Sequence, residues 1–124
     1  MEIIATNKAP AAIGPYSQAV KVGNLLFTSG QIAINPETAQ VVAGGIAEQT
    51  EQIMKNLGAV LAEAGLSYTD AVKTTCFLAE IADFATFNEI YGKYFTGKPA
   101  RSCVAVKDLP KGVLAEVEVI AEFK

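Results

Sequence analysis

Histidine and tryptophan are absent from this sequence, and it has two cysteines. Without an imidazole, a Ser-His-Asp triad, a Cys-His pair and a histidine-ligated zinc are all excluded. A zinc site made of thiolates alone needs about four cysteines, and Cys76 and Cys103 are too far apart for a CxxC motif. We therefore expect two free thiols, no metal site and none of the commonest hydrolytic mechanisms.

Long apolar runs and clusters of one charge are also missing. No segment approaches the ~20 apolar residues of a membrane span, and the first residues, MEIIATNK, do not resemble a secretory leader. We expect a cytoplasmic protein with no membrane partner. The net charge of −3, without a basic cluster, argues against a nucleic-acid partner.

The chain has 124 residues, of which 51% are hydrophobic and 19% charged. A chain of this length buries roughly two thirds of its unfolded surface, which is enough for a core without disulfides or metal ions. The sequence contains no internal repeat and no linker. Residues 1–124 are therefore expected to form a single domain.

The hydrophobic pattern predicts an α+β fold, in which two helices pack on one face of a mixed sheet of about six strands. The helix at 46–64 has an apolar stripe, so its polar positions, Gln49 and Asn56 among them, are expected to face solvent. In order, the expected elements are strands at 16–22 and 25–33 around a Gly23-Asn24 turn, a helix at 46–64, a strand at 72–78, a helix capped by Asp83 and ended by Gly97, and strands at 101–106 and 113–123.

The last strand alternates between apolar and mixed positions along its whole length. Val117 and Val119 belong to the apolar face, while Glu116 and Glu118 share the other face with Ile120. Two helices can cover only one side of the sheet, so its other side needs a different cover. Association between the sheets of neighbouring subunits would provide it, and we expect an oligomer.

Arg101 is the most unusual polar residue, because it follows Pro99-Ala100 and begins a run, SCVAV, that is expected to be buried. Strand alternation places its side chain on the same face as Cys103. A guanidinium is permanently charged and forks onto carboxylates, which suits an anion site. A salt bridge at an interface or rim explains the residue equally well, and spacing alone leaves both interpretations open.

Other candidates are scattered and each has an ordinary explanation. Tyr16 can pack beside a proline, and Ser29-Gly30 can serve close backbone packing. Asn88 lies among aromatic residues that are expected to be core, where a buried amide needs partners. Cys103 can be a small buried hydrophobe, and Glu116 a solvated edge charge. From the residues alone, these positions support no more than a small-anion site at a subunit interface.

Longer stretches of the sequence resemble one known family. GPYSQAV, LLFTSGQI, LAEAGL, KTTCFL, FNEIYGKYF and above all PARSCVAVKDLPKGVLAEVEV are similar to the RidA family, also called YjgF, near its imine deaminase branch. The resemblance runs from about Ala9 to Phe123. It implies a chorismate-mutase-like fold and a homotrimer whose sheets form a central barrel, with three sites at the subunit interfaces.

The same resemblance implies a function and a set of roles. The implied activity is a 2-iminobutanoate/2-iminopropanoate deaminase, which hydrolyses 2-imino acids from pyridoxal-phosphate-dependent dehydratases to 2-oxo acids and ammonia, without a cofactor of its own. Arg101 would bind the substrate carboxylate, and Cys103 with Glu116 would hold the attacking water. The pocket would be shaped by Tyr16, Ser29, Gly30 and Asn88. Alternatives are a non-catalytic regulator that binds 2-oxo acids and, less consistent with the acidic charge, an endoribonuclease or translation inhibitor.

Overall fold

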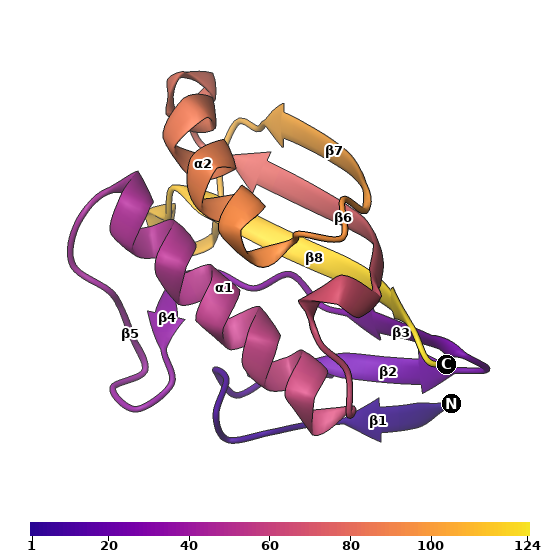
Figure 1. Ribbon diagram of the computed structural model, residues 1–124. Helices are drawn as coiled ribbons and strands as arrows, with labels where there is room; N and C mark the ends of the chain where they lie inside the picture. The colour runs from indigo at the N-terminus through magenta and orange to yellow at the C-terminus, as the bar shows by residue number, and fades with distance from the viewer.

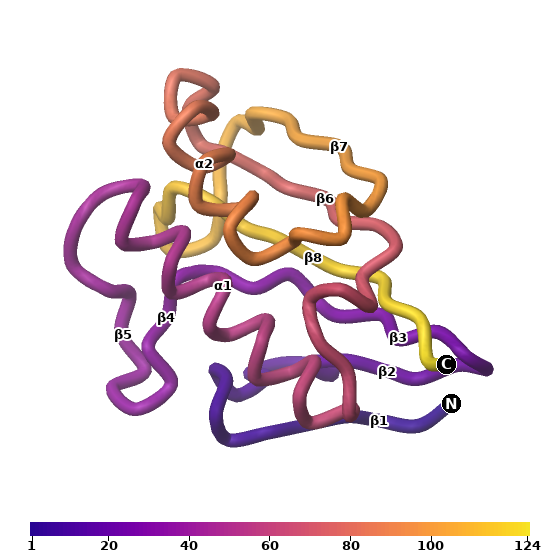
Figure 2. Tube along the Cα trace, in the orientation of Figure 1, coloured from indigo at the N-terminus to yellow at the C-terminus, as the bar shows by residue number.

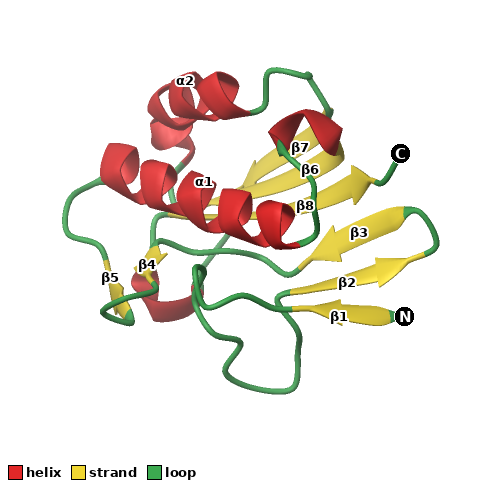
Figure 3. Cartoon of the chain, turned by 60° about the horizontal axis from the view of Figure 1, so that its bottom comes forward, coloured by secondary structure: helices red, strands yellow, loops and turns green.

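A computed structural model describes residues 1–124. Its main feature is a six-stranded mixed sheet in the order β1-β2-β3-β8-β6-β7, with the helices α1 and α2 on one face (Figures 1 and 3). A separate hairpin, β4-β5, lies beside the start of α1. The bounds are β1 Glu2–Ile4, β2 Ala19–Val22, β3 Leu25–Thr28, β4 Ile34–Asn35, β5 Gln40–Val41, α1 Ile46–Glu63, β6 Ala71–Leu78, α2 Phe84–Tyr94, β7 Ala100–Ala105 and β8 Ala115–Glu122.

The segment from β6 through α2 to β7 forms a βαβ unit. β7 lies beside β6 in parallel register, with Cys76 opposite Cys103 and Thr74 opposite Arg101, whereas all other neighbours in the sheet are antiparallel. A parallel pair needs a crossover, and α2 provides it over the end of the sheet. Figure 2 shows the chain passing from β6 through α2 to the edge strand β7, which places α2 beside β7.

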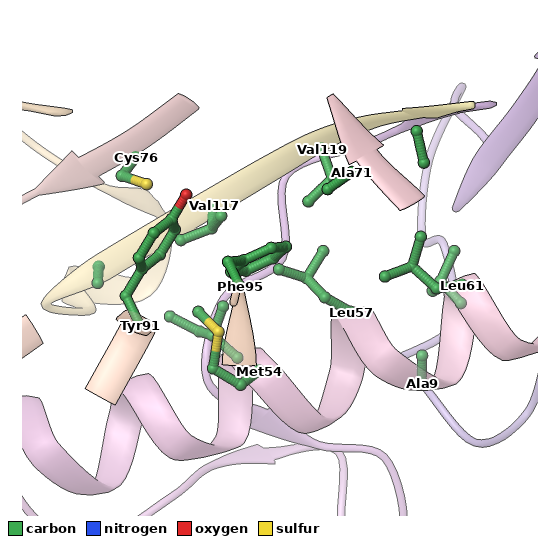
Figure 4. Close-up of a cluster of buried hydrophobic side chains, with 14 of the residues drawn as sticks. Ala9, Met54, Leu57, Leu61, Ala71, Cys76, Tyr91, Phe95, Val117 and Val119 are labelled. Atoms are coloured by element: carbon green, nitrogen blue, oxygen red, sulfur yellow. The ribbon is translucent and has the colours of Figure 1, made fainter. Parts of the chain in front are cut away.

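The core lies between the helices and the sheet (Figure 4). Leu57 and Leu61 of α1 and Phe95 after α2 point toward Val117 and Val119 of β8. The expectation that the polar positions of α1 face solvent is wrong for Gln49 and Asn56, which are buried. Gln49 accepts a hydrogen bond from the Leu114 N–H at 2.9 Å, and Asn56 donates to the carbonyls of Ile32 and Ile34 at 3.1 and 2.9 Å. These amides satisfy backbone groups that no strand or helix pairs.

The two faces of the sheet differ as the alternation in β8 predicts. The side chains of Ala115, Val117, Val119 and Ala121 are buried under the helices, and those between them lie on the open face. That open face carries exposed apolar residues from three strands: Ile3 is 61%, Val22 51% and Phe27 38% exposed. The chain therefore has an apolar sheet surface that its own helices leave uncovered.

Several boundaries differ from those expected. β1 is an additional edge strand, and the predicted hairpin strands at 16–22 and 25–33 are shorter, with β3 ending at Thr28. Asp83 stands at the N-cap of α2 without capping it, because its φ of −83° already belongs to a preceding 3₁₀ turn. α2 ends at Tyr94, before Gly97. Neither helix combines the length and apolar character that a membrane crossing requires.

Candidate functional site

The bulge after β3 explains why Ser29 and Gly30 leave the sheet. The ladder between β3 and β8 stops after Phe27 and Ile120 and resumes as a single bridge between Gln31 and Val117. Three residues of one chain segment therefore oppose two of β8, which defines a β-bulge. The Thr28 hydroxyl accepts the hydrogen bond of the Val119 N–H at 3.0 Å and replaces a lost ladder bond.

Gly30 lies directly against the side chain of Glu116. A Cβ on Gly30 would overlap the Glu116 carboxyl group and would stand 2.8 Å from its carboxyl carbon. The absence of a Cβ at Gly30 therefore gives the Glu116 carboxyl group its present position, since the φ of Gly30 is not in the left-handed region. Beside it, the Ser29 hydroxyl donates to the Ser17 carbonyl at 2.6 Å. Gly30 therefore lies against the Glu116 carboxyl group, and the family resemblance implies a role in the site for both residues.

Tyr16, Ser29, Gly30, Glu116 and Glu118 line one cavity of about 700 Å³, which we call the glutamate pocket. Tyr16 is 53% exposed, and its hydroxyl accepts a long hydrogen bond from the Ile13 N–H at 3.4 Å. The neighbouring loop is anchored by the buried Gln18, whose amide donates to the carbonyls of Thr6, Ala9 and Pro10. Four of the predicted site residues therefore meet in this cavity.

Glu116 is half-buried, and removal from water raises the pKa of its carboxyl group. The negative charge of Glu118, two residues along the same face of β8, raises that pKa further. Both effects favour the protonated form and bring the group closer to exchanging a proton near neutral pH. A carboxyl group of this kind is suited to general acid and base chemistry.

A second group of residues surrounds Arg101 at the other end of the sheet. Arg101 Nη1 donates to Asn88 Oδ1 at 2.7 Å, and the guanidinium carbon lies 4.8 Å from the ring centroid of Tyr91 and 5.6 Å from that of Phe84. We call Phe84, Asn88, Tyr91, Arg101 and Cys103 the arginine cradle. The expectation of a buried Asn88 is wrong: its side chain is exposed, because it faces the guanidinium instead of the core.

The arginine cradle can bind an anion. The amide of Asn88 is neutral, so its hydrogen bond leaves the positive charge of Arg101 intact, and it uses one of five guanidinium N–H donors. An open depression of about 680 Å³ lies at this place and is lined by Arg101, Asn88 and Tyr91 together with Lys98. A small carboxylate is the chemical group that such a fork fits.

Cys103 is half-buried beside Arg101, on the same face of β7 as predicted. Burial raises the pKa of the Cys103 thiol, although the charge of Arg101 acts in the opposite direction. Burial also raises the pKa of Cys76 to about 12. Both thiols are free and stay protonated at neutral pH, which does not suit a nucleophile.

The two groups lie on opposite faces of the sheet within one chain. Arg101 pairs with Thr74, which is buried under the helices, whereas Glu116 pairs with Phe77 on the open face. Cys103 and Glu116 are likewise separated by β6 and by the sheet itself. The predicted site residues therefore form two clusters, and one chain does not bring Arg101 and Glu116 together. No group of three or more His, Cys, Asp or Glu side chains is placed to hold a metal ion.

Sequence reasoning missed the aromatic partners of Arg101. The aromatic residues around Asn88 were expected to be core, which holds for Tyr91, whereas Phe84 is 36% exposed beside the guanidinium. The spacing gives a signal that could have found them: residues 84, 88 and 91 lie at i, i+4 and i+7 on one helix face. Gln18 was missed because its role is to anchor a loop, which no local pattern reveals.

A family model described as Endoribonuclease L-PSP matches residues 6–123. The chain belongs to the RidA family. A RidA-family relative from Rattus norvegicus, named 2-iminobutanoate/2-iminopropanoate deaminase, is 53% identical over 97% of this chain and 88% of its own length. A Lactococcus lactis relative, 55% identical over 100% of this chain and 99% of its own, is named as a regulator, AldR. The crystal structure of E. coli TdcF with bound serine has a TM-score of 0.95 at 43% identity and covers 100% of both chains.

Proposed function

We propose that this RidA-family protein is a cofactor-independent deaminase of the cytosol that hydrolyses 2-imino acids to 2-oxo acids and ammonia. The observation that carries the proposal is the arginine cradle, which holds an uncompensated guanidinium at the edge of an open depression. It is supported by the rat relative, which is named for this reaction. The bound serine of the E. coli structure is a carboxylate of similar size to the proposed substrates.

The proposed reaction needs no covalent enzyme intermediate. Arg101 binds the substrate carboxylate, and a water molecule adds to the carbon of the protonated imine. Glu116, as carboxylate, takes a proton from that water as the carbinolamine forms and returns it to the nitrogen. Glu116 then takes the hydroxyl proton as the C–N bond breaks and passes it to the departing ammonia, so ammonium leaves and the 2-oxo acid remains. Placement of charge and water supplies the catalysis, which agrees with a chain that contains no histidine.

We propose further that the site is completed in a homotrimer of chorismate-mutase-like architecture. The open sheet faces would form a central barrel, and the arginine cradle of one subunit would face the glutamate pocket of the next. Two observations support this: the open face exposes Ile3, Val22 and Phe27, and Arg101 and Glu116 lie on opposite faces of one chain. The mass in solution should then be three times 13.0 kDa. A monomer at micromolar concentration would contradict the interfacial site.

The test of activity generates the imine in place. A pyridoxal-phosphate-dependent dehydratase acting on threonine or serine releases the imino acid, and the appearance of 2-oxobutanoate or pyruvate is followed with and without this protein. The deaminase proposal predicts faster product formation at unchanged dehydratase activity. An unchanged rate contradicts it.

A second candidate is a regulator that binds 2-oxo acids in the same cradle without catalysis, and the name of the Lactococcus relative favours it. Saturable binding of 2-oxobutanoate together with an unchanged rate in the dehydratase assay would support this alternative. Acceleration by the protein, lost in Arg101→Ala, would exclude it as the sole function.

A further inference from the structure

We propose that Tyr91, held in place by Thr74, is a positioning residue that fixes the guanidinium plane of Arg101 for the incoming carboxylate. This inference rests on the anion-binding role of Arg101 in the proposed function and assigns the part of the fold that orients it. Three observations carry it: the stacking of Arg101 on Tyr91, the fixation of the Tyr91 ring, and the position of Asn88.

The guanidinium of Arg101 lies across one face of α2. Its carbon is 4.8 Å from the ring centroid of Tyr91 and 5.6 Å from that of Phe84, both within the range of a cation–π interaction. Asn88, between these two positions on the same face, accepts a hydrogen bond from Nη1 at 2.7 Å. A planar group that rests on a ring and is tied at one nitrogen can neither tilt nor turn freely.

The Tyr91 ring is itself immobilised. Its hydroxyl shares a buried hydrogen bond of 2.7 Å with the Thr74 hydroxyl on β6. The ring of Phe95 stacks on the ring of Tyr91, with 4.8 Å between their centroids. Tyr91 is only 7% exposed, and Figure 4 shows its hydroxyl directed toward the sheet near Cys76. Burial raises the pKa of Tyr91, so the hydroxyl remains protonated and the bond to Thr74 persists at neutral pH.

Fixation of Arg101 matters because a free arginine side chain has among the largest conformational entropies of all residues. Arg101 extends from β7, the outermost strand of the sheet, where no further strand restrains it. The direct partner of Arg101 in the neighbouring strand is Thr74, the same residue that holds Tyr91. Thr74 therefore lies beside the backbone of Arg101 and also holds the ring on which its guanidinium rests.

The test measures binding of 2-oxobutanoate by calorimetry. Tyr91→Leu keeps an apolar side chain but removes the ring, and a cation–π interaction of ordinary strength corresponds to a loss of about 2- to 30-fold in affinity. Tyr91→Phe keeps the ring but loses the hydrogen bond to Thr74, so its affinity should lie between those of the unchanged protein and Tyr91→Leu. The matched control is Tyr94→Leu, since Tyr94 belongs to the same helix but bonds to Glu51 and packs on Tyr68, away from Arg101. Tyr94→Leu should leave binding unchanged.

A double-mutant cycle separates positioning from general damage to the fold. In an Arg101→Ala background, Tyr91→Leu should have no further effect on binding, because the group that it positions is gone. Equal losses in both backgrounds would overturn the inference, as would unchanged affinity in a folded Tyr91→Leu protein. If Arg101→Ala alone leaves binding intact, the anion site of the proposed function fails. If Arg101→Ala weakens binding but Tyr91→Leu does not, the anion site stands and only the positioning role of Tyr91 fails.

Discussion

Arg101 and Glu116 are charged residues on strands of the same sheet, yet the fold holds them in different ways. Arg101 is held by side chains: a ring beneath it, an amide beside it, and α2 behind both. The carboxyl group of Glu116 lies instead against the backbone, because a bulge brings Gly30 beside it. The first arrangement leaves a permanent charge ready for a ligand, and the second alters the acidity of the group that it surrounds.

This difference suits the two separate tasks that the proposed deaminase reaction requires. A residue that orients a carboxylate needs a fixed plane and a constant charge, which a restrained guanidinium provides. A residue that exchanges a proton needs a pKa near the working pH, and burial and a neighbouring negative charge raise the pKa of Glu116 in that direction. Variants of the two residues should therefore fail in different ways.

The largest effect is expected from Glu116→Gln. The amide keeps the shape and an acceptor oxygen but cannot take up a proton, and general acid and base assistance is typically worth about 10²- to 10⁴-fold. We expect kcat in the dehydratase-coupled assay to fall by this order, while calorimetric binding of 2-oxobutanoate changes little. Unchanged turnover in a folded protein would assign Glu116 a structural role.

Arg101→Lys should have the next largest effect, and a different one. Lysine keeps the positive charge but loses the planar fork, so a site that depends on orientation loses nearly as much with lysine as with alanine. The loss of a charged hydrogen bond, about 1.5–3 kcal/mol, corresponds to roughly 10- to 150-fold in kcat/KM. Oligomer mass and Tm serve as controls. Near-normal kcat/KM for lysine would mean that charge alone is sufficient.

The fold was predictable from the sequence where the pattern of apolar and polar residues repeats regularly over many positions. The alternation in 113–123 correctly assigned the faces of β8, and the helix at 46–64 differs from α1 by one residue. The failures lie where a contact from elsewhere decides the structure. β1 has three residues and is a strand only because β2 pairs with it, and β3 ends early because of the bulge opposite β8.

The candidate site was predictable as a set of residues but not as an arrangement. Glu116 and Gly30, for which the family resemblance implies roles in one site, lie against each other. Both residues are separated from Arg101 because β7 pairs in parallel with the edge of β6 that faces away from β8. The strands β8 and β6 therefore lie between β3 and β7. Local pattern carries no information on that order. The exposure of Asn88 has the same origin, since its partner Arg101 comes from β7.

A mixing experiment tests whether the two clusters complete each other between subunits. Arg101→Ala and Glu116→Gln are each expected to be nearly inactive. In randomly mixed trimers, about a quarter of all interfaces would combine an intact cradle with an intact glutamate pocket. Co-expression of the two variants, followed by purification of the whole oligomer population, should therefore restore about a quarter of normal activity. Absence of any recovery would contradict a site shared between subunits.

The smallest effect is expected from Glu118→Gln, which tests the acidity of Glu116. The negative charge of Glu118 contributes to the raised pKa of Glu116, so its removal should lower that pKa toward the ordinary value of a glutamate. If Glu116 acts first as a carboxylate, activity falls as the pH drops through its pKa. The acidic limb of the kcat profile should therefore move to lower pH in Glu118→Gln, with little change in kcat on the plateau.

The free energy of unfolding should also depend on the pKa of Glu116, but it should fall as the pH rises, whereas activity increases. A carboxyl group whose pKa is higher in the folded than in the unfolded state contributes stability below its unfolded pKa, and this contribution is lost as the pH rises through the folded pKa. Glu118→Gln narrows the gap between the two pKa values, so it should flatten the pH dependence of Tm over that window. Because Glu116 is only half-buried and solvent screens the interaction, the change is expected to be small. If the acidic limb of the kcat profile stays in place in Glu118→Gln while Tm changes, a group other than Glu116 exchanges the proton in the reaction.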